Sequence, residues 1–146
     1  MKLISVLIGV SLFSQISLGF AQPDLVKTPG VLCTAADPNF SNYDYPEHIA
    51  RCARNISQQE KQQVAQDYGN IPHDQWNQYE FDHLIPLCAG GSDDPKNLWP
   101  QPIADAHKKD VLEVEICTAM KAGTMLQAEA LQKVHDWFTQ LQEAQK

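Results

Sequence analysis

The chain has little positive charge: 11 Lys and Arg residues stand against 18 Asp and Glu residues, which gives a formal net charge of -7 at pH 7. This balance excludes a protein that coats nucleic acid with basic side chains, because that mode of binding neutralises many phosphates at once. Any contact with nucleic acid must therefore be local. The 146 residues also lack internal repeats, low-complexity tracts and a long linker, so one compact domain is expected.

Long hydrophobic runs are also scarce, and the single one lies at residues 3–13, just after Lys2. Small residues surround a cleavage point after Ala21, so the pattern predicts a signal peptide over residues 1–21 that is removed. The apolar run is too short to span a bilayer comfortably. We therefore expect an exported protein, periplasmic or secreted, that is monomeric and has no membrane partner.

Cysteine is limited to four residues, and no pair has the Cys-x-x-Cys spacing of a zinc knuckle; they are Cys33, Cys52, Cys88 and Cys117. Exported proteins normally oxidise their thiols, so two disulfides are favoured over a zinc site. Three pairings are possible. We favour Cys33 with Cys52 and Cys88 with Cys117, since each pair would tie an irregular segment to a nearby helix.

The first half of the chain past the signal peptide contains few regular patterns. Residues 22–45 are rich in Pro, Asp, Asn and Gly and are expected to form an extended lead-in. Residues 46–55 can form a short helix. Ser57 and Glu60 have the spacing of a capping box, which predicts a helix that Gly69 ends.

The second half predicts a hairpin followed by two helices. Residues 79–87 alternate and then become apolar, Gly90 and Gly91 form a turn, and residues 97–99 form a second extended piece. The period then becomes helical, with one face formed by Ile103, His107, Val111 and Val114, as far as Gly123. Thr124 is expected to cap a last helix, whose buried stripe would be Leu131, Val134, Phe138 and Leu141.

The chemistry is concentrated in two segments of this hairpin. Residues 82–87 read Asp-His-Leu-Ile-Pro-Leu, and residues 97–101 read Asn-Leu-Trp-Pro-Gln. Together they resemble the HNH endonuclease family, and more closely its small exported bacterial branch. The resemblance is specific from Glu80 to Gln101, and it extends more loosely to residues 54–57, Lys61 and the helical tail.

The resemblance implies an α+β protein of the ββα-metal fold over residues 46–146, with additional flanking helices around the hairpin and helix. His83 matches the general base that takes a proton from the attacking water. Asn97 matches the central Asn of the family, whose side chain ties the loop between the strands. Both residues are therefore expected at a catalytic site.

The resemblance also implies one divalent metal ion, such as Mg²⁺ or Zn²⁺. Asp82 matches the position that gives a carboxylate oxygen to this ion. His107 lies about where the family places its last metal ligand, although it is one residue further from Asn97 than in the commoner members. Asp105 and Asp110 remain alternatives to His107.

Elementary chemistry favours the same grouping. A phosphodiester repels nucleophiles and has a poor leaving group, so its cleavage needs a base near neutrality and a cation close to the developing charge. Histidine supplies such a base. Lys96, Lys108 and Lys109 flank the expected site and could hold phosphates. Asp93 and Asp94 are interpreted as a solvated loop.

The sequence thus predicts an exported, metal-dependent endonuclease that hydrolyses phosphodiester bonds in DNA with little sequence preference, and RNA is the alternative substrate. The alternative is an exported binding protein that keeps the same fold and has no catalytic activity.

Overall fold

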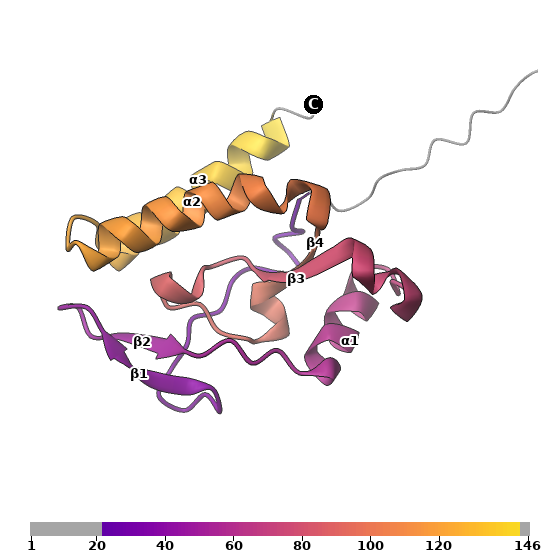
Figure 1. The fold of residues 1–146 in the computed structure, drawn as a ribbon, viewed down its shortest axis with the longest axis horizontal. Coiled ribbons are helices and arrows are strands. Elements are labelled where there is room, and N and C mark those ends of the chain that lie inside the picture. The colour runs from indigo at the N-terminus through magenta and orange to yellow at the C-terminus, as the bar shows by residue number, and fades with distance from the viewer. Residues whose placement is uncertain (1–21, 144–146) are drawn as a thin grey trace, which may run out of the picture.

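A computed structural model describes residues 22–143, and the expected signal peptide lies outside them. The described residues form an α+β fold, with two small antiparallel hairpins and three α-helices among them (Figure 1). The elements follow in the order β1 Phe40–Asp44, β2 Ile49–Cys52, α1 Gln58–Asp67, β3 Tyr79–His83, β4 Leu98–Pro102, α2 Ile103–Lys121 and α3 Gln127–Glu143. Figure 1 shows α2 and α3 side by side on one side of the molecule, with the β1–β2 hairpin and α1 on the other.

The second hairpin is the one that the sequence predicts. Strands β3 and β4 pair from Tyr79 opposite Pro102 to His83 opposite Leu98. Strand β4 continues past Pro100, where we expected it to end. Pro100 and Pro102 both fit in this strand, because a strand in a sheet of two contains positions whose backbone N–H makes no hydrogen bond to the other strand. Helix α2 begins directly after β4. The chain therefore has the order strand, strand, helix.

The first hairpin corrects two predictions. Residues 22–45 contain strand β1, and the helix expected over residues 46–55 is replaced by strand β2, which pairs with β1. The connection includes Tyr45 at φ 60° and His48 at φ 55°. Non-glycine residues adopt this left-handed conformation rarely, so the residue types at these two positions do not indicate the turn.

Helix α1 forms as its capping box predicts. The Ser57 side chain accepts a hydrogen bond from the Glu60 backbone, and the Glu60 carboxylate accepts one from the Ser57 backbone. Gly69, at φ 98°, follows the helix in the left-handed conformation that a glycine adopts without strain. Val64 and Tyr68 are buried in the core. The helix is thereby anchored beneath the β3–β4 hairpin.

Helices α2 and α3 cover the hairpin with one face each. The buried residues of α2 are Ala106, Lys109, Leu112, Ile116 and Met120, and those of α3 are Ala130, Val134 and Phe138. The face of α2 that contains His107 and Val111 is exposed. The ring of Trp99 from β4 is also buried and lies edge-on to Phe138 at 6.0 Å between centroids.

The start of α3 differs from the prediction. The helix begins at Gln127 rather than after Thr124, and the Glu129 carboxylate accepts a hydrogen bond from the Leu126 backbone. The Thr124 hydroxyl and backbone both donate to the Ala119 carbonyl. Thr124 therefore closes the end of α2.

Both predicted disulfides are present, Cys33–Cys52 and Cys88–Cys117. The first joins the segment before β1 to β2, and the second joins the β3–β4 loop to α2. Bonds that close loops of this size stabilise typical proteins by about 2–4 kcal/mol each. They also indicate an oxidising environment. Within residues 22–143, no helix has the length and apolar character needed to cross a membrane.

Candidate active site at the hairpin and helix

The end of strand β3 places Asp82 and His83 in two different surroundings. Successive side chains of a strand point to opposite faces, so these neighbours contact different partners. Asp82 faces Lys109 on α2, whereas His83 faces Asp93 in the loop between β3 and β4. The two side chains therefore form two adjoining clusters.

The His83 cluster is a buried imidazole–carboxylate pair. Nε2 of His83 lies 2.7 Å from Oδ1 of Asp93, and each side chain is only 3% exposed. The other Asp93 oxygen, Oδ2, accepts hydrogen bonds from the Asn39 side chain at 2.9 Å and the Asn55 backbone at 2.8 Å. Asp93 is thus held from two sides, which corrects our interpretation of this residue as part of a solvated loop.

Burial lowers the pKa of the His83 imidazole from its ordinary value of 6.5, although the hydrogen bond that the ring makes to Asp93 acts in the opposite direction. The ring is therefore neutral at pH 7. A neutral ring that faces a carboxylate through Nε2 carries its proton there, which leaves Nδ1 as the acceptor. This is the tautomer that a general base needs.

Asn97 holds the loop that leads from His83 to Asp93. Its side chain is fully buried; Oδ1 accepts from the Ile85 backbone at 3.0 Å, and Nδ2 donates to the carbonyls of Ile85 at 3.2 Å and Ser92 at 2.8 Å. A Cβ atom at Gly91 would lie 1.9 Å from the Ile85 carbonyl oxygen, so only glycine fits there. The contacts of Asn97 are those of a residue that ties the loop.

The Asp82 cluster contains a buried lysine. Nζ of Lys109 lies 2.6 Å from Oδ2 of Asp82 and also forms an ion pair with Glu113, one helical turn further along α2. The Lys109 side chain is 1% exposed. Burial raises the pKa of Glu113, and the Lys109 ammonium acts against that rise. The structure thus corrects the expectation that Lys109 holds phosphates, because its ammonium is enclosed between two carboxylates.

His107 lies on the opposite face of α2. It is two residues from Lys109, which corresponds to about 200° around a helix of 3.6 residues per turn. Its side chain is 94% exposed and its Nδ1 lies 3.6 Å from Asp110. The structure therefore does not bring His107 and Asp82 together as ligands of one ion.

The other expected residues of this helix also face outward. Lys108 is 67% exposed on its side chain and lies 2.6 Å from Asp105. Asp110 is 62% exposed beside His107. Neither Asp105 nor Asp110 replaces His107 beside Asp82.

Arg54 is an accessible cation at the edge of the site. It lies between β2 and α1, and its guanidinium donates to the Phe81 carbonyl at 3.0 Å and the Glu80 carboxylate at 3.3 Å. It is 3.9 Å from Oδ1 of Asp82, and 45% of its side chain is exposed. Arg54 can therefore bind a ligand while it stays close to Asp82.

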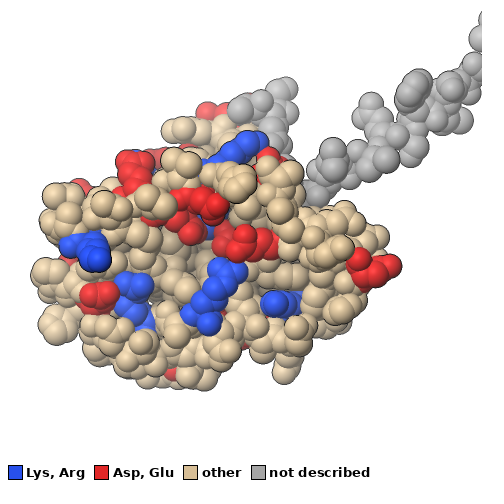
Figure 2. Space-filling model, in the orientation of Figure 1, with Lys and Arg blue, Asp and Glu red and all other residues tan. Residues whose placement is uncertain are grey.

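A groove of about 490 Å³ begins at Arg54 and runs along β3; it is lined by Arg54, Ile56, Lys61, Trp76, Asn77, Tyr79, Glu80 and Phe81. On the face shown in Figure 2, acidic side chains gather along α2, and basic side chains lie across from them toward β2 and α1. The groove thus offers two cations and two partly exposed aromatic rings beside the hairpin, although the protein as a whole is acidic.

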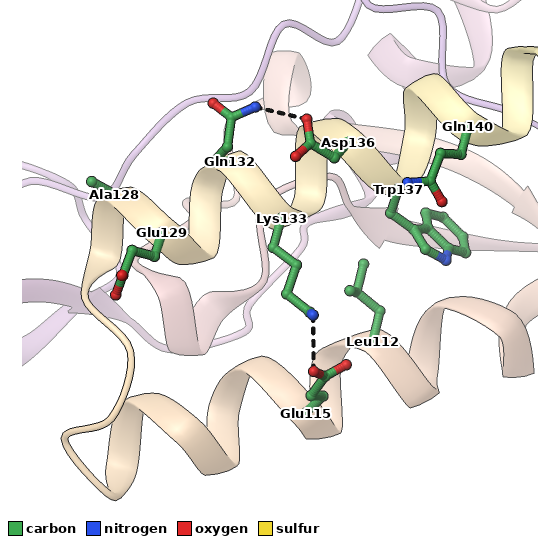
Figure 3. Close-up of a pocket in the computed structure, with 9 residues that line it drawn as sticks. All are labelled: Leu112, Glu115, Ala128, Glu129, Gln132, Lys133, Asp136, Trp137 and Gln140. Atoms are coloured by element: carbon green, nitrogen blue, oxygen red, sulfur yellow. Dashed lines mark hydrogen bonds and ion pairs between the residues drawn. The ribbon is translucent and has the colours of Figure 1, made fainter.

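A larger groove of about 710 Å³ separates α2 and α3, as Figure 3 shows. Lys133 reaches across it to Glu115 at 2.8 Å, and Gln132 pairs with Asp136 along α3. The remaining lining residues are Leu112, Ala128, Glu129, Trp137 and Gln140. This lining offers neither a histidine nor a hydroxyl or thiol nucleophile, so the candidate site is at the β3–β4 hairpin.

The divalent ion expected from the sequence needs several donor atoms close together. Among the described residues, only Cys33, Asp37 and Cys52 bring three ligand atoms within 4.8 Å of one another, a spacing that one ion could use. In the oxidised chain both sulfurs belong to a disulfide, and a metal binds the thiolate. At the hairpin, the nearest partner of Asp82 is an ammonium rather than a second ligand. The residues present do not fit the expected metal centre.

No known protein family, curated protein or solved structure matches this chain. The resemblance to HNH endonucleases therefore depends on the two hairpin segments and their arrangement.

Three residues of the site were missed as functional candidates: Asp93, Glu113 and Arg54. A histidine at a strand end needs a hydrogen-bond acceptor, so the acids of the following loop were a usable signal, although the sequence cannot choose between Asp93 and Asp94. Glu113 is four residues from Lys109, which places both on one helix face. Arg54 was noted in the resemblance, but nothing in the sequence predicted its contact with β3.

Proposed function

We propose that this protein is an endonuclease that hydrolyses phosphodiester bonds, mainly in DNA, with His83 as the general base. The observation that carries the proposal is the buried His83–Asp93 pair at the end of β3, which the Asn97 side chain holds in place. A neutral imidazole with a fixed tautomer is the group that phosphodiester hydrolysis requires.

In the proposed reaction, Nδ1 of His83 accepts a proton from a water molecule as its oxygen attacks phosphorus. A phosphorus–oxygen ester bond breaks, and the leaving oxygen takes a proton from solvent water to become a hydroxyl group. His83 then returns its proton to the solvent. Arg54, which is half exposed and close to Asp82, would stabilise the negative charge of the phosphate. No step is assigned to a divalent ion.

The groove along β3 would bind the neighbouring part of the nucleic acid. Arg54 and Lys61 can contact two phosphates, and the partly exposed rings of Trp76 and Tyr79 can contact bases without regard to sequence. Such a local binding surface is compatible with a net charge of -7.

A second candidate is a binding protein of the same fold without catalytic activity. Two observations favour it: the His83 side chain is only 3% exposed, and Asp82 is already paired with a lysine. Such a protein would use the Arg54 groove to bind nucleic acid and would not cleave it.

Nicking of supercoiled plasmid by the purified, oxidised protein tests the proposal. The reaction should be run with EDTA and, separately, with Mg²⁺, Mn²⁺ and Zn²⁺. Nicking in any of these conditions supports an endonuclease. Binding of the plasmid without nicking in all of them would contradict the proposal and support the second candidate.

A further inference from the structure

The Lys109 ammonium occupies the space between the two acidic side chains of the hairpin–helix site. Asp82 comes from β3 and Glu113 from α2, and Lys109 is paired with both. With 1% of its side chain exposed, Lys109 is among the most deeply buried residues of the described chain. An ammonium has three N–H donors and no acceptor, so it satisfies carboxylates as a small cation would.

Both carboxylate oxygens of Asp82 already face a cation of the protein. Oδ2 lies 2.6 Å from the Lys109 ammonium, and Oδ1 lies 3.9 Å from the Arg54 guanidinium, which also pairs with Glu80 at 3.3 Å. A divalent ion bound to Asp82 would lie a few ångströms from a buried ammonium, where the protein screens their repulsion less than water does.

We infer that Lys109 takes the place of a divalent metal ion at this site, so that the protein binds no such ion there. The inference also predicts what removal of the ammonium does: it leaves Asp82 and Glu113 as two carboxylates that face one vacated position. Mg²⁺ and Mn²⁺ bind through one or two carboxylates and complete their coordination with water. Loss of the Lys109 charge should thus convert the cluster into a metal site.

This inference concerns the charge of the cluster, and it stands whether or not the protein cleaves nucleic acid. It also distinguishes Lys109 from a lysine that binds substrate phosphates. Such a lysine must be accessible, as Lys108 is with 67% of its side chain exposed, whereas Lys109 is enclosed.

Calorimetric titration of the oxidised protein with Mn²⁺, followed by melting curves with Mn²⁺ or EDTA, tests the inference without a substrate. The wild-type protein and the control variant Lys108→Met should show no saturable site that depends on Asp82. Lys109→Met should acquire a saturable Mn²⁺ site, with an affinity on the order of a hundredfold above any residual binding by the wild type, because a buried like charge has been removed. Its melting temperature should rise with Mn²⁺ through linkage to binding, and the added substitution Asp82→Asn should abolish both effects.

Two results would overturn the inference. One is a Mn²⁺ site in the wild-type protein that Asp82→Asn removes. The other is a folded Lys109→Met variant that gains no Mn²⁺ affinity. If Lys109→Met does not fold even with Mn²⁺ present, the comparison of wild type with Asp82→Asn still decides whether the natural site takes a divalent ion.

Discussion

Nε2 of His83 lies 2.7 Å from Oδ1 of Asp93, and the structure buries both side chains almost completely. The pair joins the last residue of β3 to the loop that returns to β4. Because one Asp93 oxygen is bound to the ring and the other to Asn39 and Asn55, the carboxylate fixes both the orientation of the imidazole and the position of its proton.

Asp93→Asn tests this orientation. The asparagine can still accept from the ring, but it removes the negative charge and one of the acceptor oxygens. We expect kcat to fall on the order of a hundredfold with little change in KM, and the free energy of unfolding to fall by about 1–3 kcal/mol. Asp94→Asn changes the exposed neighbouring acid and is the matched control. A fall in KM alone or an unchanged kcat would disagree with the assigned role.

The pH dependence of stability provides a second test. Burial lowers the pKa of His83 below 6.5, so the unfolded chain binds this proton more readily than the folded protein does. The contribution of the neutral His83 ring to the free energy of unfolding is therefore fully present above about pH 6.5. It is lost as the pH falls through the pKa that His83 has in the folded protein. Melting temperatures measured from pH 8 to pH 5 should fall less in His83→Gln than in wild type. The exposed-residue variant His135→Gln should retain the wild-type profile.

Asn97→Ala should act through the loop. The substitution leaves two carbonyls and one backbone N–H without their partner inside the protein, and each such buried group costs roughly 1–3 kcal/mol. We expect a clear fall in the urea midpoint together with a loss of activity. Asn42→Ala, at an exposed position of β1, should leave the free energy of unfolding within about 0.5 kcal/mol of wild type. A fully stable but inactive Asn97→Ala would contradict a tying role.

Binding of DNA should depend on salt only weakly. If the groove contacts two or three phosphates, the slope of log affinity against log salt should be about -2 to -3 on duplex DNA. Arg54→Ala should reduce the magnitude of the slope by about 0.9, the value for one phosphate contact. Arg51→Ala is a suitable control, because that side chain pairs with Asp44 at 2.9 Å. An unchanged slope in Arg54→Ala would remove this residue from the binding surface.

The sequence predicted the elements that have strong local signals. The capping box at Ser57 predicted α1, and the favoured cysteine pairing is the one observed. The alternation over residues 79–87 predicted β3, although the strand ends at His83. The β1–β2 hairpin was missed because Tyr45 and His48 adopt a left-handed conformation that their residue types do not indicate.

The site was predicted in part, for a physical reason. His83 and Asn97 lie in a continuous motif, so their neighbourhood follows from local sequence. The inward face of α2 depends on packing instead. Apolar residues such as Val111 and Val114 occur on the exposed face as well, and their spacing with His107 concealed the face that Lys109 and Glu113 share. Tertiary contacts, which the sequence does not show, decide which face is buried.

The central claim is that His83 acts as the base in phosphodiester cleavage. Its most direct test compares initial rates of plasmid nicking by wild type and His83→Asn, both oxidised and purified in parallel, at pH 7.5. Melting curves and DNA binding should show that the variant is folded and still binds plasmid. We predict that the variant cleaves on the order of a hundredfold more slowly or not at all. Equal rates for the two proteins would contradict the account.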